Sequence, residues 1–173
     1  RQGENRPFGR VFESVLRASF PPGHPYRWLP IGSMEDLNAA TLEDVQEWFR
    51  TYYGAANVVL VLAGDIDLAT AREKAQKYFG HIPPGPGLDR PGTWVAARTE
   101  STREIMHDPG AQTRLHRFWN TAPDGSLDAE RLSIVGQILG GGKTSRLYER
   151  LVYREQIADT VSAGLIGFEI AGL

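Results

Sequence analysis

Residues 41–67, TLEDVQEWFRTYYGAANVVLVLAGDID, decide the fold of this 173-residue chain. Thr41 and Asp44 have the spacing of a capping box, in which each side chain accepts a hydrogen bond from the other residue's backbone N–H. After them, apolar and aromatic side chains recur three and four residues apart as far as Tyr52, which is the spacing of one face of an amphipathic helix. The sequence therefore predicts a capped helix over 41–52 with one face buried.

A continuous apolar run, VVLVL at 58–62, follows this helix. Because turn residues bound it, the run predicts a strand over 57–63 that is buried on both faces. Asp67 is a typical N-cap residue, and it begins a second helix that ends near Phe79. Helices and strands in this mixture indicate an α+β fold.

The flanking sequence predicts further elements by the same criteria. Residues 8–20 form a helix that ends before Pro21, and residues 160–173 form a closing pair of strands. The other expected elements are strands over 104–107 and 112–119, and a helix from Thr144 or Ser145 to Arg154. A helix over 128–139 is expected to turn four apolar side chains inward, namely Leu132, Val135, Ile138 and Leu139.

Residues 83–93 have the proline- and glycine-rich composition of a linker. The four prolines of its densest part are Pro83, Pro84, Pro86 and Pro91. The predicted organisation is the back portion of a first domain over 1–82, the linker, and the front portion of a second domain over 94–173. Since the chain begins without Met and ends in an apolar stretch, we expect it to be part of a longer protein.

The composition argues against several classes of function. With 19 Lys and Arg against 21 Asp and Glu, the formal net charge is -2, which provides no electrostatic footprint for nucleic acid or an anionic membrane. No apolar run reaches the length of a membrane-spanning helix. The sequence has no cysteine, which excludes disulfides, thiolate metal sites and cysteine nucleophiles.

The motif GGGKTS at 140–145 has the ending of a phosphate-binding P-loop. A P-loop reads G-x-x-x-x-G-K-[ST] and follows a buried strand, so that backbone N–H groups cradle phosphates. Aligned on Lys143, its first glycine would fall on Gln137, and the preceding element is a predicted helix. We interpret the motif as the end of one helix followed by the N-cap of the next.

The remaining reactive side chains form no recognisable catalytic pattern. The histidines lack metal-ligand spacing, so we expect loop or surface positions for His81, His107 and His116 and a packing or turn role for His24. No G-x-S-x-G elbow supports a serine hydrolase. Three arginines four residues apart have glutamates nearby and predict a solvated, salt-bridged helix face, made of Arg146, Arg150, Arg154, Glu149 and Glu155.

Two blocks of sequence carry a resemblance to a known family. They are GHPYRWLPIGSMEDLNAATLEDVQEWFRTYYGAANVVLVLAGDID at 23–67, followed by KYFGHIP, and ILGGGKTSRLYERLVYREQIADTVSAG at 138–164. In this order they resemble the pitrilysin/insulinase family of zinc metallopeptidases, which includes the mitochondrial processing peptidases, in the region of its C-terminal inactive domain. The resemblance implies an α/β sandwich with a largely antiparallel sheet and helices on one face, spanning a domain junction.

The resemblance also implies where zinc chemistry would lie. In the family, zinc is held by H-x-x-E-H on one helix and by a downstream Glu, while the Glu of the motif activates the attacking water. No H-x-x-E-H occurs in this chain. The downstream Glu would precede residues 1–7, so Glu4 is not a candidate ligand. We therefore expect no catalytic and no metal-binding residue here, and zinc in the parent protein.

A family Arg and Tyr help to hold the substrate and the oxyanion of the tetrahedral intermediate, which is an electrostatic role. In the matching segment, residues 151–159, Val152 stands at the Arg position and Asp159 at the Tyr position. The substrate-binding residues of this chain therefore stay unassigned. The resemblance implies a partner half or subunit that supplies the Arg and the Tyr.

Two functions are open at this point. The first is a non-catalytic portion of a zinc-dependent metalloendopeptidase, inactive alone, that shapes a chamber for peptides or unfolded polypeptides and makes inter-domain or inter-subunit contacts. The second is a structural scaffold without peptidase activity, like the core subunits of respiratory complexes that resemble these peptidases. Exposed strand edges could also pair two copies into a homo-oligomer. From the resemblance we expect a periplasmic or cytoplasmic location, with the periplasm slightly favoured.

Overall fold

The computed structural model describes residues 6–173, so Glu4 lies outside the described residues. The chain forms two compact units. Unit 1 combines Arg1–Ile31 with Pro91–Leu173, and unit 2 is Gly32–Arg90. The two units are defined by contacts between residues, which do not test the predicted domain boundary over 83–93. That boundary therefore stays a prediction.

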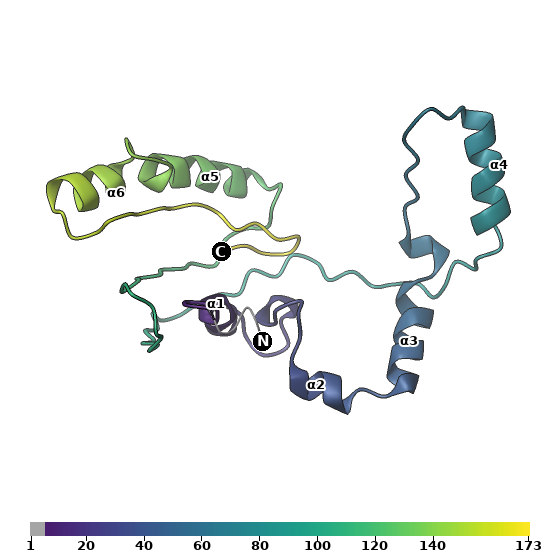
Figure 1. Cartoon of the computed structure of the whole chain (residues 1–173), viewed down its shortest axis with the longest axis horizontal. Helices are drawn as coiled ribbons and strands as arrows, with labels where there is room; N and C mark the ends of the chain where they lie inside the picture. Colours follow the sequence, from purple (N-terminus) through teal and green to yellow (C-terminus); the bar gives the residue numbers. More distant parts are fainter. Residues whose placement is uncertain (1–5) are drawn as a thin grey trace. The chain divides into compact units, whose positions relative to one another are not determined.

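Helices are the regular structure of the described residues (Figure 1). In chain order the α-helices are α1 (Val11–Ser19), α2 (Met34–Ala39), α3 (Leu42–Tyr52), α4 (Leu68–Phe79), α5 (Leu127–Gly140) and α6 (Arg146–Tyr148). Short 3-10 turns occur at η1 (Pro25–Arg27) and η2 (Ala55–Asn57), and η3 (Glu149–Arg154) is a π-helix. Within 6–173, no helix is both long and apolar enough to cross a bilayer.

The predicted helix starts are confirmed at α3 and α4. Asp44 N–H donates to Thr41 Oγ1 at 3.2 Å, and Thr41 N–H donates to Asp44 Oδ2 at 2.8 Å, which completes the capping box. At α4, Thr70 N–H donates to Asp67 Oδ1 at 2.9 Å. The Thr41 hydroxyl at α3 and the Asp67 carboxylate at α4 each satisfy a backbone donor that the first helical turn leaves without an intrahelical partner.

The capping box of α3 makes its helicity depend on pH. The backbone and side-chain hydrogen bonds from Thr41 lower the pKa of Asp44 below its ordinary value of 3.8. A lowered carboxyl pKa stabilises the folded helix above the ordinary value, and this contribution is lost as the pH falls through the folded pKa. We expect circular dichroism to show less helix for Asp44→Asn than for the wild type at neutral pH, and the difference to shrink below pH 3.8. An equal loss at every pH would contradict this coupling.

The predicted antiparallel sheet is wrong for this structure. Among residues 6–173 the pairing is limited to isolated antiparallel bridges, Thr121 with Gly172 and Gly167 with Gly172. The segments expected as strands at 57–63, 104–107 and 112–119 form no ladder. A ladder requires a second extended segment about 4.8 Å away, and apolar patterning predicts an extended conformation without supplying that neighbour.

The core of unit 1 joins α1 to the C-terminal segment. Its buried members are Leu16, Phe20, Ala96, Ala171 and Leu173. The segment folds back on itself, since the backbones of Ile166 and Leu173 exchange hydrogen bonds at 2.9 and 3.0 Å. These contacts bring together residues more than 150 positions apart in the sequence.

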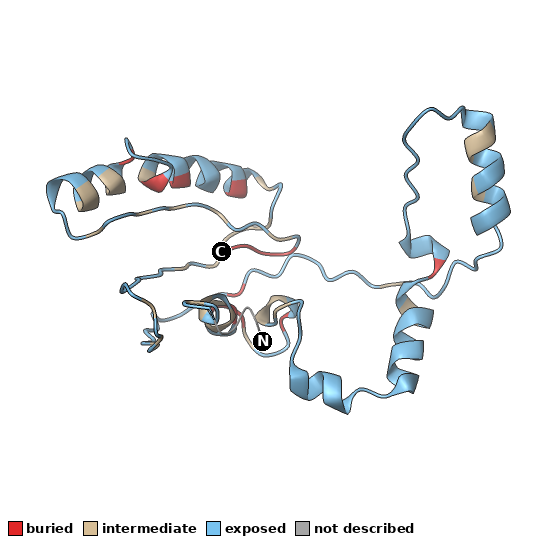
Figure 2. Cartoon of the chain, in the orientation of Figure 1, coloured by how far each residue is buried: buried red, intermediate tan, exposed pale blue. Residues whose placement is uncertain are grey.

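Unit 2 keeps almost all of its side chains in solvent. Every residue of Gly32–Arg90 is described, and Gly54 alone is buried; Figure 2 shows α3 and α4 almost wholly exposed. A Cβ on Gly54 would lie 2.3 Å from the carbonyl oxygen of Pro84, so this close backbone approach requires glycine. The strand predicted as buried over 57–63 is exposed, because no second layer covers either of its faces within this unit.

Candidate functional site

The described residues do not fit a zinc ion. No group of three or more His, Cys, Asp and Glu side chains within 6–173 is placed to hold a metal. Zinc in proteins takes three or four such ligands in a tetrahedral arrangement.

His24 is a buried packing residue, as its sequence context predicts. Its Nδ1 accepts from Tyr26 N–H at 3.1 Å, and its Nε2 lies 2.9 Å from the carbonyl oxygen of Trp94. Because Nδ1 accepts, the ring proton belongs on Nε2, which donates to Trp94. The ring also stacks on Phe20, with centroids 4.4 Å apart. Both ring nitrogens are thus occupied, and neither is available for catalysis. The other three histidines are exposed, as predicted.

The GGGKTS motif follows a helix, which confirms its interpretation as a helix end and a helix start. Gly141 N–H donates to the Gln137 carbonyl at 3.0 Å and closes α5. Ser145 is the N-cap residue of α6 but makes no side-chain cap hydrogen bond. Its buried Oγ has no partner among the described residues.

The two positions assigned by resemblance lie in and after η3. Val152 is half-buried within η3, while Asp159 is exposed and accepts from Gln112 Nε2 at 3.3 Å. The structure does not bring Val152 and Asp159 into a common site. Neither can supply the cation or phenol that the family's Arg and Tyr provide, so these assignments stay predictions.

The predicted salt-bridged face is confirmed, with a spacing that the sequence did not indicate. Arg150 Nε donates to Glu155 Oε1 and Arg154 Nη2 donates to Glu149 Oε1, each at 2.6 Å. Both pairs are five residues apart, because the π-helical turn bonds residue i to i+5. The ion pair with Glu155 raises the pKa of Arg150 above its ordinary value. Both pairs are exposed and contribute little stability.

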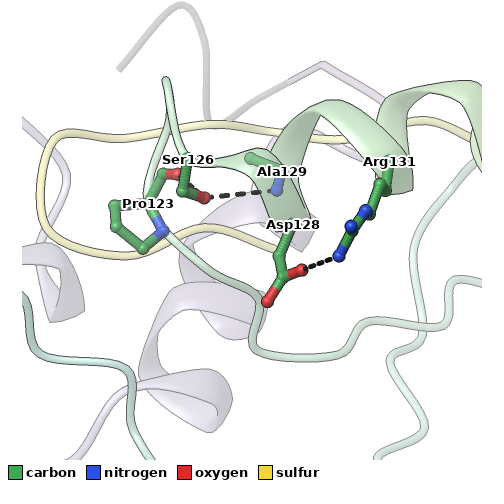
Figure 3. A network of polar contacts seen from close by, with 5 residues as sticks. All are labelled: Pro123, Ser126, Asp128, Ala129 and Arg131. Carbon is green, nitrogen blue, oxygen red and sulfur yellow. Dashed lines mark hydrogen bonds and ion pairs between the residues drawn. The ribbon is translucent and has the colours of Figure 1, made fainter.

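An open groove of about 520 Å³ lies beside the first half of α5. Figure 3 shows how α5 begins there: Ser126 Oγ donates to the Pro123 carbonyl and accepts from Ala129 N–H, and Arg131 bonds Asp128. The residues that line the groove include Asp124, Glu130, Leu165 and Gly167. It therefore combines carboxylates with apolar surface.

The buried face of α5 consists of small residues, Ala129, Gly136 and Gly140. The prediction that its large apolar side chains turn inward is wrong for Leu132, Val135 and Ile138, which are exposed, while Leu139 is half-buried. A Cβ on Gly140 would lie 2.2 Å from the backbone nitrogen of Ala163, and one on Gly136 would lie 2.9 Å from Gly164 Cα. The neighbour of α5 is thus a bare backbone, which only glycine admits at this distance.

Residues 160–165 form the segment that packs against α5. Val161, Ala163 and Leu165 are half-buried, whereas Thr160, Ser162 and Gly164 are exposed, the alternation of an extended strand. Among residues 6–173, its backbone N–H and C=O groups have no hydrogen-bond partner. The four-residue spacing of Gly136 and Gly140, which places both on one face of α5, is the sequence signal for this contact, and it was not among the predictions.

Residues 39–173 match the family model described as the peptidase M16 inactive domain. The chain belongs to this family. The match confirms the resemblance drawn from the sequence. The chain is thus an M16 inactive domain of zinc-protease-like proteins.

Individual relatives of the M16 inactive domain differ in activity. The chain is 26% identical over 163 residues to zinc protease PqqE of Helicobacter pylori, covering 90% of this chain and 35% of that protein. It is 20% identical over 158 residues to the non-peptidase homolog YmxG of the same organism, covering 89% and 35%. The chain therefore spans about a third of the length of these relatives.

A solved structure shares the fold of this M16 inactive domain. The crystal structure of a protease from Helicobacter pylori superposes with a TM-score of 0.67 at 21% identity, covering 98% of this chain and 42% of that one. At this identity the likeness establishes the fold alone. The path of the backbone is therefore that of a known protein, although the described residues form no sheet.

Proposed function

We propose that this M16 inactive domain is a non-catalytic portion of a zinc-dependent metalloendopeptidase that shapes its peptide-binding chamber and makes inter-domain or inter-subunit contacts. One observation carries the proposal, the unpaired backbone of the extended segment over 160–165. An extended peptide can add to such an edge through main-chain hydrogen bonds, a mode that accepts many sequences. The segment is held in place by Gly136 and Gly140 of α5.

The groove beside α5 would determine which peptide side chains the edge at residues 160–165 prefers. Its lining includes Leu165, which belongs to the same segment, and the acidic residues Asp124 and Glu130. Side chains of an added peptide alternate between the two faces of the pair. Those on the α5 side would meet apolar surface and negative charge, which favours basic and apolar peptide residues.

Proline at position 162 should weaken peptide binding. The side chain of Ser162 is exposed, so an alanine there leaves the packing against α5 intact, while proline removes a backbone donor and reshapes the edge. We expect Ser162→Pro to lower the affinity for an unstructured, Lys-containing peptide about tenfold, and Ser162→Ala to leave it unchanged. Fluorescence anisotropy of a labelled peptide measures both. Equal affinities for the two variants would rule out pairing at this edge.

Zinc and the missing Arg and Tyr belong, in this proposal, to other parts of the parent protein. The lack of a metal-binding group among the described residues supports this division of roles. Incubating the purified chain with zinc and unstructured peptides tests it. We expect neither stoichiometric zinc uptake nor hydrolysis, and finding both together would overturn the proposal.

A scaffold role is the second candidate, favoured by the similarity to a non-peptidase homolog. Val152 and Asp159, in place of the family Arg and Tyr, fit a scaffold equally well. The coding sequence upstream of Arg1 distinguishes the two functions. An H-x-x-E-H motif there favours the peptidase, and a sequence that continues the family without the motif favours the scaffold.

A further inference from the structure

Residues 6–31 precede the range that the family model matches, which begins at residue 39. They nevertheless belong to the same compact unit as Pro91–Leu173. The predicted linker over 83–93 separates these two parts of unit 1 along the chain, so each contact between them crosses the predicted domain boundary. Residues 6–31 are called the N-terminal segment below, and residues 94–173 the second portion.

The two parts meet at the C-terminus of α1. The last turn of a helix leaves its carbonyl oxygens without intrahelical donors. Arg98 Nη1 donates to the Ala18 carbonyl at 2.6 Å, and Asn120 Nδ2 donates to the Ser19 carbonyl at 2.9 Å. Both donors come from the second portion, so side chains 80 and 101 positions downstream complete the end of α1.

A guanidinium is well suited to this position. The C-terminus of a helix carries a partial negative charge, and hydrogen bonds from a charged donor are roughly twice as strong as neutral ones. Arg27, within the N-terminal segment, donates to the carbonyls of Arg17 and Phe20 at 2.7 and 2.6 Å. The four consecutive carbonyls of residues 17–20 therefore all accept side-chain hydrogen bonds, two of them from the second portion.

Apolar side chains from both parts form a common core. Its buried members are Leu16 and Phe20 from the N-terminal segment and Ala96, Ala171 and Leu173 from the second portion. Tyr26 adds a further link, because its hydroxyl accepts from Ile170 N–H at 3.1 Å. An apolar core combined with directed hydrogen bonds is the anatomy of a specific protein interface.

We propose that the N-terminal segment is a docking element that holds the second portion non-covalently, so that the two stay together when the linker is cut. Its partner is the surface of the second portion that carries Arg98, Asn120 and the buried side chains of the common core. The inference rests on the proposed function, since it names the inter-domain contact of that function. All of these contacts lie within unit 1, so they do not depend on where unit 2 lies.

Cleavage of the folded chain tests the proposal. A protease recognition sequence inserted between Arg90 and Pro91 lies at a boundary of the two units, and both residues are exposed. Cutting it yields residues 1–90 and 91–173 from a chain that has already folded. We expect the pieces to co-elute at low micromolar concentration, and analytical ultracentrifugation of a dilution series to give their Kd. Pieces that separate on cleavage would overturn the proposal.

Removing the donors of the second portion should weaken this association. Arg98→Ala and Asn120→Ala each leave an α1 carbonyl without its donor, so each should raise the Kd of the pieces about tenfold. Circular dichroism before cleavage checks that each variant is folded.

Arg117→Ala is the matched control for Arg98→Ala. Arg117 is also an exposed arginine of the second portion, but its cation–π contact, 5.3 Å from the Trp119 ring, stays within that portion. It should change the Kd by less than about twofold. Equal effects of Arg98→Ala and Arg117→Ala would contradict docking through the carbonyls of α1.

Peptide binding is measured separately, on the uncut chain. Residues 160–165 supply none of the docking contacts named above, so the two proposals can fail independently. Pieces that separate, from a chain that binds peptide when uncut, would overturn the docking element alone. Pieces that stay together, from a chain that binds no peptide, would support the docking element and overturn the peptide-binding edge.

Discussion

His24→Ala is expected to lower the free energy of unfolding of unit 1 by about 3–4 kcal/mol. The ring is completely buried, and its removal leaves two backbone groups without partners, the Tyr26 N–H and the Trp94 carbonyl. It also removes the stacking on Phe20, where the ring centroids are 4.4 Å apart. Urea unfolding followed by circular dichroism measures the loss.

Two conservative variants divide this effect between its causes. His24→Gln places an amide N–H near the position of Nε2 and should keep the hydrogen bond to Trp94. His24→Asn places an amide oxygen near Nδ1 and should keep the hydrogen bond from Tyr26. Each should cost less than His24→Ala. His107→Ala, at an exposed position of the same unit, is the control and should change stability by less than about 0.5 kcal/mol. A similar loss in His107→Ala would contradict the structural role of His24.

Gly140→Ala is expected to destabilise unit 1 by about 2 kcal/mol. The new Cβ would lie 2.2 Å from Ala163 N and 2.7 Å from the carbonyl carbon of Ser162. Both atoms belong to the backbone, so the clash is relieved only by moving the 160–165 segment away from α5. The gain in helix propensity, at most about 1 kcal/mol, offsets part of this cost. Chemical denaturation measures the net change.

Gly164→Ala is the matched control for this prediction. Gly164 lies on the opposite side of the same contact, but a Cβ there meets no atom within 4 Å. We expect its stability to stay within about 0.5 kcal/mol of the wild type. If the two alanine variants were equally stable, α5 would not be packed on the backbone of residues 160–165. Gly140→Ala should also weaken peptide binding, because it displaces the proposed binding edge.

The local signals in the sequence predicted the starts of α3 and α4, whereas no helix was predicted where α2 lies, although Ser33 caps it. Thr41 and Asp67 begin α3 and α4 as expected, because an N-cap needs partners only three residues away. His24 was correctly assigned to packing beside Pro25 and Tyr26. The ion pairs of Arg150 and Arg154 were expected as a group, but their five-residue spacing depends on a π-helical turn that periodicity does not reveal.

The candidate site was less accessible to sequence reasoning. The apolar side chains of α5 pointed to one buried face, whereas the structure buries Gly136 and Gly140 instead. The large side chains are the stronger signal in a helical wheel, and glycine matters only when a backbone approaches the helix. That approach comes from residues 162–164, more than 20 positions downstream.

The sequence by itself determined the family and the capped starts of α3 and α4, because each depends on motifs or on neighbours within a few residues. Only the tertiary structure decided which surfaces are covered. It left the VVLVL run at 58–62 exposed, closed the core of unit 1 around Phe20 and Ala171, and laid residues 160–165 against the glycines of α5. Burial and strand pairing depend on contacts between distant segments, and an apolar pattern states that a partner is needed without stating where it lies.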